Sequence, residues 1–140
     1  MDPAIWPRVH GAAVHFPLAL ALGSGALDAA AFALGPRPVA RDLHAAGHWM
    51  MVGGALGSVP AVVSGLLMTR GSLLGHGALR LHHLFVWPAF ALLVGLATWR
   101  VCTGQCAPRR AFAIYLVGTA IAAALMTVAG YWGGEMMIAR

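Results

Sequence analysis

Four apolar stretches, each about 20 residues long, fill most of this chain. A helix rises about 1.5 Å per residue, so a stretch of this length crosses the hydrocarbon core of a membrane, about 30 Å thick. Charged residues make up only 9% of the chain, against about 25% in soluble domains. The sequence therefore predicts an integral membrane protein with one transmembrane domain, residues 1–140. The expected spans are residues 11–34, 44–68, 78–99 and 111–132.

The connections between the expected spans are short. The first of them contains the segment Gly35–Pro38, which includes two prolines. Proline lacks a backbone donor and disfavours helix in the residue before it, so this segment ends the first span. Short connections force neighbouring spans to run antiparallel. The expected fold class is all-α, an integral membrane four-helix bundle with up-down-up-down topology.

Arginines flank the spans and supply all nine basic residues. They form no basic stripe with interleaved aromatic residues, which argues against a nucleic-acid surface. Cytoplasmic loops of membrane proteins are enriched in basic residues. The side holding the first and third connections has five arginines and the other side has four, so both termini are predicted to lie outside the cytoplasm. The five are Arg37, Arg41, Arg100, Arg109 and Arg110; the four are Arg8, Arg70, Arg80 and Arg140.

Five of the seven histidines lie near the starts of the first and third spans, which share one membrane face. Coordinating groups inside spans are costly, so they indicate a function. His15 and His82 would place two imidazoles across the bundle at one depth, as in a bis-histidine haem b. His83 remains open as the second ligand, because neighbouring residues on a helix point about 100° apart.

Other residues at this end suit a haem pocket. Gly133 leaves room for a flat macrocycle, Trp132 can form its wall, and Arg80 is suited to pair with propionates. The alternative is a polar network without a cofactor, in which the histidines hydrogen-bond to backbone carbonyls. A non-haem metal is less favoured, because the chain lacks an HExxH motif, a CxxC pair and a carboxylate-rich cluster.

Asp28 is the only acidic residue deep within a span. It lies about ten residues before the middle of the first connection, and His48 lies about ten residues after it, so antiparallel pairing puts the two side by side. Tyr115 in the fourth span lies at a comparable depth. A lone carboxylate in hydrocarbon must be paired, neutral or hydrated. The three residues are therefore candidates for a proton relay or quinone pocket, or for a buried pair that fixes packing.

Cys102 and Cys106 lie in the third connection, in a CxxxC spacing. A disulfide and, with His44, a metal site are both open. The predicted orientation places this connection in the reducing cytoplasm, which favours two thiols.

Several of these residues form a pattern that resembles a known family. The pattern comprises His-Gly-Ala-Ala-Val-His-Phe-Pro at residues 10–17, Asp28, Leu81 with His82, and Gly-Tyr-Trp-Gly-Gly-Glu at residues 130–135. It resembles the bacterial four-helix membrane family known as domain of unknown function 2231, over nearly the whole chain. Members often have proline after the first histidine, where this chain has Gly11. Some members are joined to c-type cytochrome or sugar-aldehyde dehydrogenase modules, and this association implies electron transfer.

The leading hypothesis is a membrane redox subunit with one haem b near the periplasmic face. It would pass electrons between a periplasmic donor, such as a c-type cytochrome or dehydrogenase, and the quinone pool or an oxidase. Such a subunit is an electron carrier rather than an enzyme, because catalysis would take place in a partner. The alternative is a cofactor-free anchor or accessory subunit of a larger complex. A transporter is less favoured, because the middles of the spans are almost entirely apolar.

Overall fold

The computed structural model describes residues 5–104 and 107–138, and in these ranges the chain forms α-helices and no strand. Each helix contains the span expected from hydropathy and continues beyond it at one or both ends. Polar turns at a membrane surface can extend a helix whose apolar part alone sets the hydropathy signal. The helices are α1 (Ile5–Leu34), α2 (Pro38–Met68), α3 (Gly77–Thr103) and α4 (Arg109–Ile138).

The turn between α1 and α2 is set by glycine and proline. Gly35 has a φ of +67°, a left-handed conformation that glycine adopts without strain, and its N–H bonds to the Ala31 carbonyl at 3.2 Å. Pro38 is the first residue of α2, where its missing N–H costs nothing. Only three residues therefore separate the two helices, and this short turn fixes which residues of α1 and α2 lie opposite each other.

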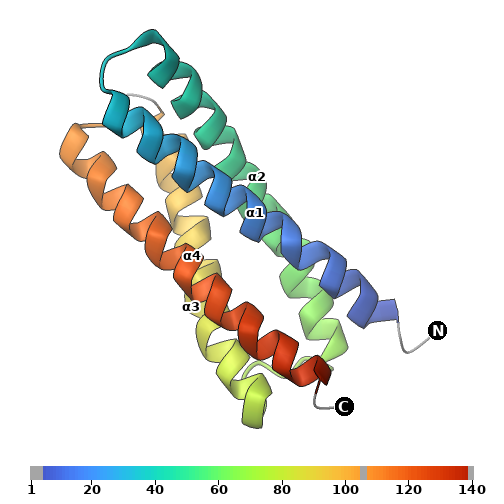
Figure 1. Ribbon diagram of the computed structural model, residues 1–140. Coiled ribbons are helices and arrows are strands. Elements are labelled where there is room, and N and C mark those ends of the chain that lie inside the picture. Colours follow the sequence, from blue (N-terminus) through green and yellow to red (C-terminus); the bar gives the residue numbers. More distant parts are fainter. Residues whose placement is uncertain (1–4, 105–106, 139–140) are drawn as a thin grey trace.

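The helices form an antiparallel bundle in which α1 packs on α2 and α4, and α3 packs on α2 and α4. Figure 1 shows that α1 begins and α4 ends at the same end of the molecule. The predicted all-α, up-down-up-down bundle is confirmed. Small residues allow α1 and α2 to approach closely: a Cβ added at Gly54 would lie 3.4 Å from the Leu20 Cβ.

Apolar side chains cover the outside of the bundle, whereas several polar ones point inward. Phe16, Trp49 and Ile114 are each at least 67% exposed. A water-soluble protein would not present such a surface, but lipid accommodates it. All four helices are long and apolar enough to cross a membrane. The chain is thus a multi-pass membrane protein, and its buried polar residues are the features that need a chemical explanation.

Candidate functional site

Asp28 lies at the centre of a polar network inside the bundle. It belongs to the buried face of α1, which recurs every three or four residues and also contains Ser24 and Ala31. Its side chain is fully buried. A buried carboxylate must be compensated by hydrogen bonds or an opposite charge. One partner, Ser24, lies one turn away on α1, and the others come from the other three helices. Together they form the Asp28 cluster: Ser24, Asp28, His44, Arg100 and Tyr115.

Arg100 supplies the opposite charge. Its side chain is only 1% exposed, and its Nη2 donates to Asp28 Oδ1 at 2.7 Å and to the His44 carbonyl at 2.9 Å. The guanidinium also faces the aromatic rings of Phe112 and Tyr115, with its central carbon 5.1 Å and 5.2 Å from their centroids. The Asp28–Arg100 pair is therefore a buried ion pair between α1 and α3, the two helices on one diagonal of the bundle.

The remaining contacts satisfy both carboxylate oxygens. His44 Nδ1 lies 3.0 Å from Oδ1, and the Tyr115 hydroxyl donates to Oδ2 at 3.0 Å. Ser24 donates to the Gly47 carbonyl at 2.8 Å and lies 3.5 Å from Oδ2. One carboxylate thus joins all four helices, in a bundle whose helices gain little from apolar burial against lipid.

The partner of Asp28 on α2 is His44, which corrects the predicted pairing with His48. The connection between α1 and α2 is centred on Pro36, midway between Leu34 and Pro38. The residue opposite Asp28 is therefore His44. A centre near residue 38 would instead place His48 opposite Asp28, and His48 is one helical turn beyond His44.

His48 instead lies one turn further along α2. Its ring meets Trp49 edge to face, with centroids 5.2 Å apart, and it lines a shallow pocket with Ala45 and Gly104. Tyr115, the third member of the predicted group, does reach Asp28. The structure thus brings Asp28 and Tyr115 together and leaves His48 outside the cluster.

Sequence reasoning missed Arg100 because an arginine at the end of a span is ordinarily a membrane-surface charge. In the structure Arg100 shares the buried face of α3 with Leu93 and Ala97. The helix is apolar on every side, so nothing in its sequence marks that face in advance.

Gly47 gives a direct test of how tightly the Asp28 cluster packs. A Cβ added there would lie 2.7 Å from Asp28 Oδ1, so Gly47→Ala must displace the carboxylate from its partners. We expect it to destabilise the protein by about 1–3 kcal/mol in a detergent unfolding measurement. Gly95→Ala is the matched control, since a Cβ at Gly95 meets nothing within 4 Å. Equal stability of the two variants would contradict this packing.

A second group of polar residues lies at the end where α1 and α3 begin, here called the histidine end. His10 Nδ1 bonds to the Ala61 carbonyl at 2.9 Å, and His82 Nδ1 bonds to the Ala129 carbonyl at 2.7 Å. A carbonyl only accepts, so each Nδ1 carries a proton, and in the neutral form of such a ring the lone pair is on Nε2. An imidazole held in this way is oriented as metal-ligating histidines commonly are.

Two other histidines of this end, His15 and His83, differ from His10 and His82. His15 is exposed, and its Nδ1 bonds to the Gly11 carbonyl of its own helix at 2.6 Å. Within the described residues no hydrogen bond or ring contact joins His15 to α3. His83 is buried next to His82 and Trp87, with ring centroids 5.7 Å and 6.0 Å away, and its Nδ1 has no hydrogen-bond partner among the described residues.

The expected walls of the haem pocket take different positions. Gly133 packs against the ring of His82, since a Cβ there would lie 3.4 Å from His82 Nδ1. The space at this glycine thus holds an imidazole rather than open volume. Trp132 is half-buried, and Arg80 is exposed. Within residues 5–104 and 107–138, no group of three or more His, Cys, Asp or Glu side chains is placed to hold a metal ion.

Cys102 is exposed near the end of α3. Cys106 lies outside the described residues, so the choice between a disulfide and two thiols stays a prediction.

Comparison with known proteins bears on the family of this chain. No curated protein and no solved structure is significantly similar to it. A family model described as a predicted membrane protein, DUF2231, matches residues 7–139. The match confirms the resemblance carried by the motifs at residues 10–17 and 130–135. Since it covers nearly the whole chain, this protein belongs to the DUF2231 family of membrane proteins.

Proposed function

We propose that this protein is an electron-transfer subunit of a bacterial inner-membrane redox complex, with one b-type haem bound at the histidine end. The observation that carries the proposal is that three histidines there make the same kind of hydrogen bond. His10, His15 and His82 each bond through Nδ1 to a backbone carbonyl, which leaves Nε2 as the free donor atom. Neutral imidazole nitrogens from two helices are the donor set of a bis-histidine haem.

The positions of the two histidines of α1 support His10 over His15 as a proposed ligand. His10 and His15 are five residues apart, which is about 140° around a helix, so the two cannot face the same neighbour. His10 is half-buried against α2, whereas His15 is exposed. We therefore propose His10 and His82 as the axial pair, in place of His15 and His82. His83 remains the alternative on α3, because its buried Nδ1 lacks a partner among the described residues.

A haem held in this way would supply a one-electron carrier, and the chain would supply orientation and shielding. The backbone carbonyls of Ala61 and Ala129 fix the two rings, and Gly133 allows His82 to approach α4 closely. The chain has no CxxCH motif, so the haem would be held without covalent attachment. The proposed electron partners are a periplasmic c-type cytochrome or dehydrogenase and the quinone pool or an oxidase.

The Asp28 cluster has a structural role in this proposal rather than one in proton transfer. Both oxygens of Asp28 are occupied, and its charge is compensated by Arg100. The cluster would then hold the four helices in register, so that the histidines of α1 and α3 meet at the other end.

The reduced-minus-oxidised absorption spectrum of the purified protein tests the haem proposal. Protein made in cells supplied with haem should show the bands of a b-type cytochrome. A folded but colourless preparation would contradict the proposal and favour the alternative of a cofactor-free anchoring subunit.

We propose that the loops after α1 and α3 face the cytoplasm. Arg100 is neutralised by Asp28 inside the bundle, and the remaining arginines of the sequence divide four against four. The connections alone still favour this orientation. The two loops at the Asp28 end and their flanks hold four arginines, and the single connection at the histidine end holds two. The four are Arg37, Arg41, Arg109 and Arg110; the two are Arg70 and Arg80.

Cysteine labelling of intact cells measures this orientation. In a chain with Cys102 and Cys106 replaced by serine, Ser72→Cys should react with a membrane-impermeant maleimide added from outside. Arg37→Cys should react only after the cells are broken. The reverse pattern would overturn the orientation and place both native cysteines in an oxidising compartment.

A further inference from the structure

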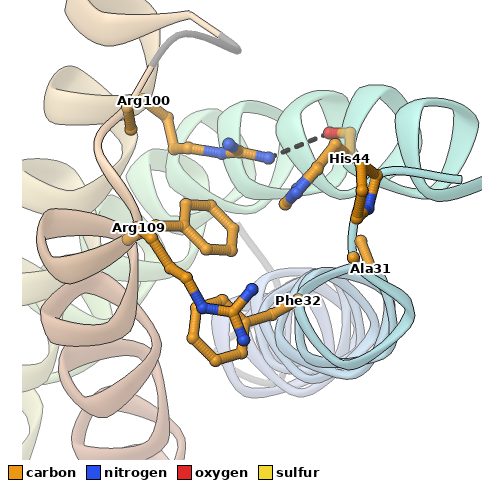
Figure 2. Close-up of a pocket in the computed structure, with 9 residues that line it drawn as sticks. Ala31, Phe32, His44, Arg100 and Arg109 are labelled. Atoms are coloured by element: carbon orange, nitrogen blue, oxygen red, sulfur yellow. Dashed lines mark hydrogen bonds between the residues drawn. The ribbon is translucent and has the colours of Figure 1, made fainter.

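A pocket of about 270 Å³ opens beside the Asp28 cluster, at the end of the bundle away from the histidine end. Figure 2 shows Arg100 and Arg109 reaching towards it from α3 and α4, with Phe32 and His44 on the facing helices. Phe112 and the turn residues Gly35 and Pro36 complete much of the lining. Two guanidinium groups and two phenyl rings thus surround one opening near the expected membrane surface.

The charge of Arg109 at this pocket is not balanced by any residue that the structure describes. Its guanidinium lies over the Phe32 ring, 4.1 Å from the centroid, and none of the ion pairs in the described ranges involves it. Arg109 is also the first residue of α4, and the first turn of that helix has no acid. The N-terminus of a helix carries partial positive charge. A cation there is unfavourable unless an anion joins it.

Arg100 adds a second, independent sign of an anion site. It lines the pocket, its side chain is 1% exposed, and its Nε is buried with no hydrogen-bond partner in the described part of the chain. The Nη2 is already committed to Asp28 and to the His44 carbonyl. An unpaired buried N–H of a charged group is costly, so the guanidinium at the wall of this pocket has hydrogen-bonding capacity that the described residues leave unused.

We propose that this pocket binds the phosphate group of an anionic phospholipid. Guanidinium groups bind phosphate oxygens through charge-assisted and often paired hydrogen bonds. The phenyl rings of Phe32 and Phe112 suit the apolar part of a lipid more than they suit a small hydrated ion. Basic pockets between transmembrane helices near the membrane surface are where lipid headgroups are recognised.

Arg109 and its neighbour Arg110 provide a matched pair of variants. Both are exposed and lie at the start of α4, but only Arg109 lines the pocket. Titration of phosphatidylglycerol into the purified full-length protein in detergent, followed by native mass spectrometry, measures binding. Arg109→Gln should weaken binding about tenfold, the loss of one charge-assisted contact. Arg110→Gln should change it less than about twofold, and Arg109→Lys should recover part of the loss.

Three results would overturn the proposal. One is equal binding by the Arg109→Gln and Arg110→Gln variants, with circular dichroism showing both folded. Another is equal affinity of the wild type for phosphatidylglycerol and phosphatidylcholine. The third is inorganic phosphate displacing the lipid at equal concentration, which would identify the ligand as free phosphate instead. The proposal stands if phosphatidylglycerol binds more tightly than phosphatidylcholine and inorganic phosphate do, and if Arg109→Gln weakens this binding while Arg110→Gln does not.

Discussion

Asp28→Leu should lower the unfolding free energy of the protein by about 3–5 kcal/mol, the cost of breaking a buried ion pair by removing one partner. The reason is that Arg100, 1% exposed, would remain charged and uncompensated inside the bundle. Arg100→Leu should be similarly damaging, because Asp28 would then lose the guanidinium that compensates its charge. Unfolding in detergent, followed by circular dichroism, measures both effects.

The double variant, Asp28→Leu with Arg100→Leu, should recover much of the loss, since two apolar side chains can replace a buried ion pair at little cost. Asp28→Asn should fall between wild type and Asp28→Leu, because the amide keeps an acceptor for Tyr115 but leaves the charge of Arg100 unpaired. Asp42→Leu is a suitable control, because Asp42 is an exposed acid on α2. Additive losses for Asp28 and Arg100 would mean that the two side chains are not coupled.

His82→Gln is expected to abolish haem binding, and His10→Gln is expected to do the same. Glutamine keeps a donor for the backbone carbonyl that each imidazole now contacts, so the fold should survive while the iron ligand is lost. His15→Gln should retain haem, because His15 is exposed and turned to its own helix. Haem content per folded chain, measured as the pyridine haemochrome, distinguishes these variants.

His76→Gln is the control for this series, since His76 is exposed and lies just before α3. Retention of haem by His82→Gln with loss in His83→Gln would move the ligand by one residue on α3. Loss in His15→Gln alone would contradict the choice of His10 and restore the ligand expected from the sequence.

The fold could be predicted from the sequence because its main signals are local. Long apolar stretches define the helices, and Gly35 with Pro38 sets the first turn. Lone acids in spans are rare, so the burial of Asp28 in a polar network was also predictable. Its partner on α2, His44, could not be predicted in the same way. Hydropathy places the start of the second span near His44, although the helix begins at Pro38, and a small error in the loop centre moves the partner by a full turn.

The rotation of the helices was harder to predict than their ends. Helices that are apolar on every side carry almost no amphipathic signal, so the side facing the bundle cannot be read from hydropathy. His15 was therefore expected inside, although the structure places His10 there. Arg100 was assigned to the membrane surface for the same reason. In both cases the inward position depends on packing among all four helices, which sequence spacing within one helix does not determine.

The low-temperature electron paramagnetic resonance spectrum of the oxidised, purified protein tests most directly whether two histidines of this bundle hold a haem. Ligation by His10 and His82 predicts a low-spin ferric signal that disappears in His82→Gln. A high-spin signal, or no haem in a folded preparation from cells supplied with it, would contradict bis-histidine ligation.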